Sequence, residues 1–162
     1  ILLIAGAPFL FGWAKPVPID PYRLGTRTTL WVALAGPVSN LILALLATLP
    51  LRVILSIPNL DAIVPSALAV LAVPAVDFLV FFAFLNIILA LFNLIPLAPL
   101  DGWKVLLGLV PPERAWQLQS YERYGPPLLL LLVFMDRFVD FDPLGTYLWG
   151  GAEAVLSLLL PG

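Results

Sequence analysis

Two long runs without a charged residue constrain the fold of this chain more than any other feature. The first run covers residues 30–51 and the second covers residues 78–100. Each is long enough to cross a bilayer, because a helix needs about 20 mainly apolar residues to span the hydrocarbon core. Backbone polar groups in that core must bond to one another, as they do in a helix. We therefore predict an all-α fold, a polytopic bundle of transmembrane helices.

Composition agrees with this class and excludes several kinds of chemistry. Only 11% of the 162 residues are charged, whereas about a quarter are charged in a soluble domain. There is no basic cluster with interleaved aromatic residues, so we expect the lipid bilayer and membrane proteins as partners and no nucleic acid. The chain has no cysteine and no histidine, which removes thiolate chemistry and the commonest zinc ligand. No repeat or linker divides residues 1–162, so we expect a single membrane-embedded domain.

A proline-rich segment precedes the first run. The prolines at positions 16, 18 and 21 disfavour a helix and favour extended backbone. Trp13 is a residue type that settles at the membrane interface. We expect a short extended interfacial loop over residues 12–21. It is either a simple connector or a strand-like edge that pairs with a substrate backbone.

The first run contains a notch of small residues, Ala-Gly-Pro-Val-Ser-Asn at 35–40. Small side chains let another helix approach closely, and Pro37 loosens the preceding turn. Asn40 is costly in lipid unless it faces protein or water. Either the notch packs a neighbouring helix, or it admits a substrate segment that passes Gly36 and bonds to Asn40.

The second apolar stretch, residues 66–100, is too long for one straight span. We expect Pro74 and Asp77 to divide a short entry segment from a span over roughly 78–97, with Asp77 at the interface or at a helix N-terminus. Three further segments follow: interfacial residues 102–124, a short helix at 126–135, and residues 143–160, which either span partially or lie at the interface.

The end of the second run carries the strongest candidate for chemistry. Pro96 and Pro99 each lack a backbone N–H donor, so the helix must loosen there. Carbonyl groups that lose their helical partners at membrane depth must be buried in protein or face a water-filled cavity. Asn93 can bond to such groups or to an extended peptide. Asp101 then presents a carboxylate, a hard metal ligand, beside the sharp turn that Gly102 permits. The alternative is that Asp101 only marks the membrane interface.

Basic residues predict the orientation of the chain. Six of the eight lie within residues 15–27 or 102–124, namely Lys15, Arg23, Arg27, Lys104, Arg114 and Arg123. Only Arg52 lies between the runs. The positive-inside rule therefore places residues 15–27 and 102–124 on the cytoplasmic side of the membrane, which we expect to be a bacterial cytoplasmic membrane.

Three motifs together resemble the site-2 protease family of intramembrane zinc metallopeptidases. They are Gly-Trp-Ala-Lys-Pro-Val-Pro at 12–18, the notch at 35–40, and Asn-Leu-Ile-Pro with Leu-Asp-Gly over 93–102. The resemblance covers about residues 1–135. It implies a zinc endopeptidase that cleaves membrane-spanning substrates, with Asp101 as a zinc (Zn) ligand.

The same resemblance implies roles for four further residues. Asn93 resembles the family's asparagine that is associated with positioning the substrate near the metal, and Pro96 belongs to the same motif. Gly36 and Asn40 resemble the small-residue and asparagine positions of the family's central helix. These four residues are the predicted substrate-binding positions.

The chain departs from the family in one large respect. In the family, an HExxH helix supplies two imidazoles, one helical turn apart, that bind zinc, and a glutamate that activates the zinc-bound water. This chain has no histidine. We therefore expect these residues alone to hold no zinc and to be inactive. Either the chain is truncated, as the apolar start at Ile1 suggests, so that it forms the C-terminal portion of a longer peptidase domain, or it is a degenerate, non-catalytic relative.

Two other functions compatible with the sequence are a membrane protein that binds partner helices through the notch at Gly36, and a transporter fragment. In the transporter fragment, helices broken at Pro37 and Pro96 would frame an ion site.

Overall fold

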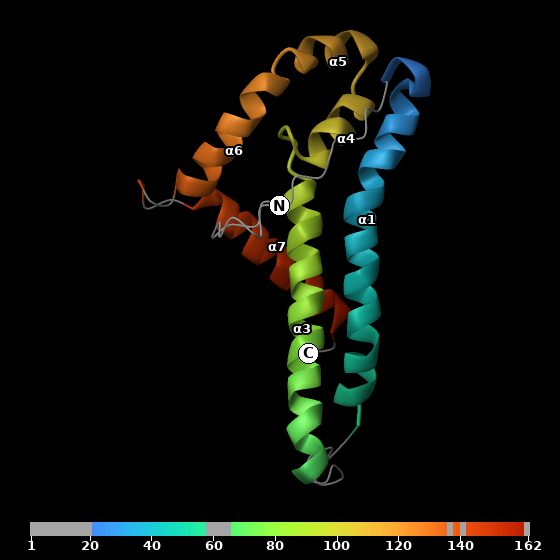
Figure 1. Cartoon of the computed structure of the whole chain (residues 1–162), viewed down its shortest axis with the longest axis vertical. Coiled ribbons are helices and arrows are strands. Elements are labelled where there is room, and N and C mark those ends of the chain that lie inside the picture. Colours follow the sequence, from blue (N-terminus) through green and yellow to red (C-terminus); the bar gives the residue numbers. More distant parts are fainter. Residues whose placement is uncertain (1–20, 58–65, 136–137, 140–141, 161–162) are drawn as a thin grey trace, which may run out of the picture.

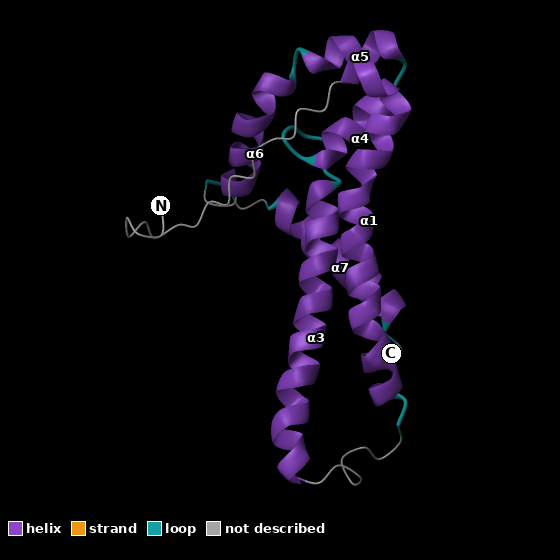
Figure 2. Cartoon of the chain, turned by 45° about the vertical axis from the view of Figure 1, so that its right-hand side comes forward, coloured by secondary structure: helices purple, strands orange, loops and turns teal. Residues whose placement is uncertain are grey.

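The computed structural model describes residues 21–57, 66–135, 138–139 and 142–160. Helices joined by short loops and turns make up these residues, and no strand occurs among them (Figure 2). In chain order the elements are α1 (Pro21–Leu55), α3 (Ser66–Asn93), α4 (Asp101–Leu109), α5 (Pro112–Gln119), the 3₁₀ helix η1 (Glu122–Tyr124), α6 (Gly125–Phe134) and α7 (Pro143–Leu159). The all-α prediction is confirmed.

Helices α1 and α3 lie side by side along most of the molecule (Figure 1). Their buried residues recur every three or four positions and are mostly small, which brings the backbones close. On α1 they are Ala33, Pro37, Ala44, Ala47, Thr48 and Leu51, and on α3 they are Ala83, Asn86, Ile87 and Ala90. The Thr48 hydroxyl and the Asn86 amide donate to carbonyls of their own helices, so these buried polar groups are satisfied.

Helix α7 packs against α3 and completes the core. Ala152 belongs to the same buried cluster as Ala44 and Ala83, and the rings of Trp149 and Phe84 lie 5.1 Å apart. At the C-terminal end of α7, the carbonyls of Leu158 and Leu159 accept hydrogen bonds from the Arg52 guanidinium. The 17 residues of α7 are about 25 Å long at 1.5 Å per residue. The helix runs obliquely across α3 (Figure 1) and ends beside Arg52 of α1.

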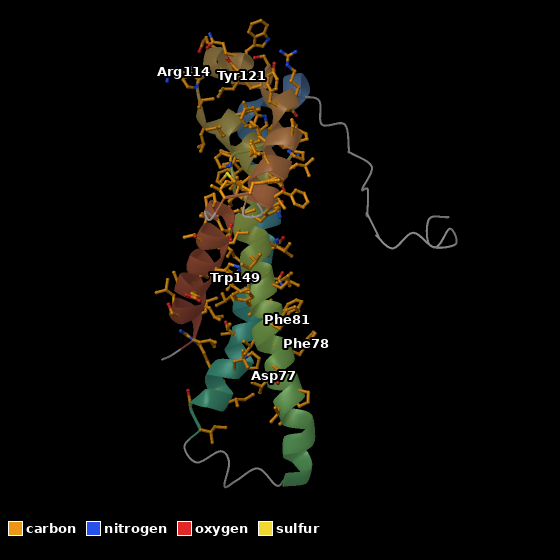
Figure 3. The ribbon with its side chains drawn as sticks, turned by 90° about the vertical axis from the view of Figure 1, so that its left-hand side faces the viewer. Asp77, Phe78, Phe81, Arg114, Tyr121 and Trp149 are labelled. Carbon is orange, nitrogen blue, oxygen red and sulfur yellow. The ribbon has the colours of Figure 1, made fainter. Side chains whose placement is uncertain are left out.

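The two long helices have the character of lipid-facing spans. Residues 28–54 and 72–93 are long and apolar enough to cross a membrane, and only 28% and 22% of their most apolar windows are buried. The core helix of a soluble protein would be mostly buried. Large apolar side chains such as Trp31, Phe78 and Phe81 are exposed instead, the two phenylalanines lying along α3 in Figure 3. This is the pattern of a helical membrane protein.

The predicted division of the second stretch is wrong. Helix α3 continues through Pro74 and Asp77, and Asp77 is exposed within the helix rather than at its N-terminus. A proline removes one hydrogen bond, and the bonds on either side carry the helix across it. The helix also ends at Asn93 rather than near residue 97, because Pro96 and the prolines that follow cannot continue it.

The segments after the second stretch follow the prediction in part. Residues 102–124 form short helices, and the expected short helix at 126–135 is α6. For the proline-rich loop, residues 12–20 lie outside the described residues. Pro21 is the first residue of α1, a position where proline is tolerated because its missing N–H would be unpaired anyway.

Candidate functional site

Asp101 and Gly36 meet at the junction of α4 and α1. Asp101 is the first residue of α4, and Gly36 lies within α1. A Cβ atom built on Gly36 would lie 3.1 Å from Asp101 Oδ2, so the carboxylate rests close to bare backbone. The Asp101 side chain keeps 34% of its surface exposed. It is therefore accessible to further ligand donors from outside the described residues.

The turn before Asp101 is held from both sides by glycines. A Cβ atom on Gly102 would lie 2.3 Å from the Ile95 carbonyl oxygen, and one on Gly125 would lie 2.2 Å from the Ala98 carbonyl oxygen. Real Cβ atoms do not come this close to backbone, so both contacts require glycine. Residues 94–100 are thus packed between the starts of α4 and α6, and this packing positions Asp101.

Backbone hydrogen bonds give the turn its shape. The Leu97 N–H donates to the Ile95 carbonyl at 2.7 Å, and the Leu100 N–H donates to the Leu97 carbonyl at 2.9 Å. The Ala98–Pro99 peptide bond is cis. The turn therefore satisfies part of its own backbone after α3 ends, which is required of irregular structure at membrane depth.

Lys104 is the charged neighbour of Asp101. Its Nζ lies 3.4 Å from Asp101 Oδ1, one helical turn along α4. The N-terminus of α4 also favours a negative charge at Asp101 through the helix dipole. Both groups are partly exposed, so this ion pair is a weak one. The Lys104 ammonium group would nevertheless compete with a metal ion for the Asp101 carboxylate.

The other predicted site residues are placed differently. Asn40 is half-buried one turn along α1 from Gly36, and its side chain has no hydrogen-bond partner among the described residues. The Asn93 amide donates to the Leu89 carbonyl of its own helix at 2.8 Å. Pro96 faces α6 and α7, where it lines a cavity of about 260 Å³ together with Leu132, Pro143 and Tyr147.

Two buried residues, only the first of them at the site, were not identified from the sequence. Gly125 packs on Ala98, and the only sequence signal is a Gly-Pro-Pro triplet at the start of an apolar run. Asn86 is buried in α3, one heptad before Asn93. An asparagine in an uncharged run is a detectable signal, because its burial needs a partner.

The residues present do not form a zinc site by themselves. Structural and catalytic zinc sites use three or four protein ligands, chiefly imidazole, thiolate and carboxylate. Within the described ranges, no three His, Cys, Asp or Glu side chains come together to hold a metal, and the whole sequence lacks His and Cys. Asp101 offers a single carboxylate ligand.

Known proteins resemble this chain over most of its length. Residues 23–122 match the family described as peptidase family M50. The chain is 35% identical over 165 residues to a Bacillus subtilis (strain 168) protein named "Putative zinc metalloprotease YwhC", a match that covers 98% of this chain and 68% of that protein. No solved structure matches. The family match includes Gly36, Asn40, Asn93, Pro96 and Asp101.

Proposed function

This chain belongs to peptidase family M50, the site-2 protease family, and from that premise we propose that it forms part of an intramembrane zinc endopeptidase cleaving membrane-spanning substrates. The contact between Asp101 Oδ2 and Gly36 carries the proposal. It joins two of the three motifs that resemble the family. It also leaves a carboxylate accessible at the junction of two helices.

Asp101 is proposed as one zinc ligand of the complete enzyme. Its oxygen is a hard donor that zinc accepts, and bound zinc provides a Lewis acid for hydrolysis. The remaining ligands and the general base are proposed to come from an HExxH helix outside these 162 residues, because no histidine lies within them. The exposed side of Asp101 supports this arrangement, since it leaves room for a further helix.

The notch and the end of α3 are proposed to position the substrate. Gly36 presents no side chain beside the carboxylate, and the Asn40 amide, one turn away, has no hydrogen-bond partner within the described part of the chain. A substrate helix must unwind before a peptide bond can be attacked, which frees N–H and C=O groups that need partners. Asn40 and Asn93 supply such partners, and Pro96 helps to hold the turn beside them.

We further propose that Asp101 lies toward the cytoplasmic side of a bacterial cytoplasmic membrane. Lys104, Arg114 and Arg123 follow it, while Arg52 lies at the other end of α1. Figure 3 places Arg114 at one end of the molecule, with Asp77 well along α3 toward the other. This asymmetry of basic residues is what the positive-inside rule uses.

The test is cleavage of a membrane-spanning substrate by the protein purified from its own membranes. We expect zinc-dependent cleavage that Asp101→Asn lowers by at least about 100-fold, the scale on which a displaced catalytic group acts. Asp77→Asn, an exposed acid of α3, is the matched control and retains activity. Tight substrate capture without hydrolysis in the unsubstituted protein would overturn the proposal in favour of a helix-binding protein.

A further inference from the structure

Helix α7 contacts the last turn of α3 at Leu91 in two ways. The Tyr147 hydroxyl donates a hydrogen bond to the Leu91 carbonyl at 3.3 Å. One turn further along α7, a Cβ atom on Gly151 would lie 2.9 Å from Leu91 Cδ1, so the α7 backbone lies close to that side chain. The end of α3 is therefore held by a helix whose contacting tyrosine lies 56 positions later in the sequence.

The local sequence fixes the place of Tyr147 on α7. Asp142 caps the helix, because its carboxylate accepts a hydrogen bond from the Gly145 N–H at 2.7 Å. Pro143 is the first helical residue, where its missing N–H would be unpaired anyway. These start signals set the register of the helix. Tyr147 and Gly151, four residues apart, then share the face that meets Leu91.

The Leu91 carbonyl loses its regular helical partner where α3 ends. In a continuous helix, the donor to this carbonyl would be the N–H four residues on, at Ile95. The Ile95 N–H donates to the Phe92 carbonyl instead, at 3.2 Å, and the Leu91 carbonyl is left with the Leu94 N–H, also at 3.2 Å. Leu91 lies within an apolar span, and a carbonyl at membrane depth needs partners. The Tyr147 hydroxyl supplies one.

The turn over residues 94–100 begins directly after this contact. Glycines at the starts of α4 and α6 pack against the backbone of the turn. Toward α7 the turn is less closely packed, because Ile95, Pro96 and Tyr147 line the cavity of about 260 Å³ described above. With space left on this side, the direction of the turn depends on how the end of α3 is held.

We propose that Tyr147 is a positioning residue for the active site. Its hydroxyl holds the last turn of α3 through the Leu91 carbonyl, and thereby sets where the turn begins and where Asp101 lies. This role rests on the proposed function, in which Asp101 belongs to the active site. Tyr147 acts through Leu91 and the turn, without touching the substrate. A phenylalanine would fill the same space, so the role belongs to the hydroxyl alone.

The first measurement is amide hydrogen exchange of the complete protein, purified from its own membranes in mild detergent, and of its Tyr147→Phe variant. We expect exchange over residues 94–100 to be about fivefold faster in the variant, the effect of one lost hydrogen bond. Ser157→Ala is the matched control. It also removes one hydroxyl from α7, but that hydroxyl donates to the Ala154 carbonyl of the same helix, so exchange over residues 94–100 should not change.

The second measurement is cleavage of a membrane-spanning substrate, expressed per folded molecule. Tyr147→Phe should lower kcat about tenfold and leave KM unchanged, because a displaced Asp101 affects the chemical step. A merely structural role would lower the folded fraction and leave kcat per folded molecule intact.

The outcomes separate the contact from the activity. Faster exchange with an unchanged kcat would overturn the positioning role. Unchanged exchange would overturn the contact and make Tyr147 an ordinary tyrosine of the membrane interface. Absence of cleavage by the unsubstituted protein would overturn the proposed function and this role with it, while exchange over residues 94–100 would still report whether Tyr147 holds the turn.

Discussion

The Asp101 carboxylate of α4 lies beside Gly36 of α1, in the space that a side chain at Gly36 would need. A Cβ atom on Gly36 would lie 3.1 Å from Asp101 Oδ2, closer than side chains normally approach. The absence of a side chain at Gly36 therefore decides where the carboxylate can lie. Packing of α4 on α1 brings the two motifs together.

Gly36→Val should displace the Asp101 carboxylate. The added branched side chain occupies the space beside Oδ2, and a shift of about 1 Å in a catalytic group costs up to about 100-fold in rate. Cleavage of a membrane-spanning substrate measures the effect. Ala35→Val, at an exposed neighbouring position on the same helix, controls for the cost of a branched residue. Equal activity of the two variants would contradict the steric role of Gly36.

Gly102→Ala should destabilise the fold and misplace the turn before α4. The new methyl group meets the Ile95 carbonyl oxygen at 2.3 Å, and that neighbour is backbone that cannot swing away. Overpacking of this kind costs about 1–3 kcal/mol. The measurement is reversible unfolding in mild detergent. Gly150→Ala in α7 has no atom within 4 Å of the new methyl and should be neutral or stabilising; a similar loss in both variants would refute the account.

Lys104→Gln should raise zinc affinity in the complete protein. Lys104 Nζ lies 3.4 Å from the carboxylate that we propose as a ligand, so the cation and the metal compete for it. Stability should change by less than about 1 kcal/mol because the pair is partly exposed. A zinc titration with a competing chelator, compared with Lys104→Arg, measures the effect. A fall in affinity for Lys104→Gln would show that Lys104 assists binding.

Arg52→Gln should loosen the C-terminal end of α7. The Arg52 guanidinium donates to the carbonyls of Leu158 and Leu159, and its charge also suits a helix C-terminus. Hydrogen bonds from an exposed charged group are worth about 1 kcal/mol here. Hydrogen exchange should accelerate over residues 150–160. Arg114→Gln, on the exposed surface of α5, should leave that exchange unchanged, and identical profiles for the two variants would contradict the contact.

Much of the architecture could be predicted from the sequence, because it follows from local properties. Runs of uncharged residues long enough for a bilayer identified both long helices. The prolines at 96 and 99 predicted that the helix loosens before Asp101, although it ends earlier, at Asn93. Pro74 misled the prediction, since the loss of one backbone hydrogen bond did not interrupt the helix at that position.

The contacts that define the site could not be predicted because they depend on tertiary packing. Nothing near Gly125 in the sequence indicates that it meets Ala98. The Arg52 contact with α7 joins residues 106 positions apart in the sequence. Trp103 carries no distinctive local signal, and only the fold shows that its buried N–H has no acceptor among the residues that the structure describes. The substrate-positioning roles of Asn40 and Asn93 stay predictions.

The most direct measurement is the zinc content of the protein isolated from its own membranes, with and without Asp101→Ala. The account predicts one zinc ion per chain in the unsubstituted protein and a loss of at least about tenfold in zinc affinity without the carboxylate, as for removal of a supporting group at a metal centre. Asp77→Ala should retain the metal. Zinc bound equally tightly by the Asp101→Ala protein would contradict the central claim that this carboxylate is a ligand.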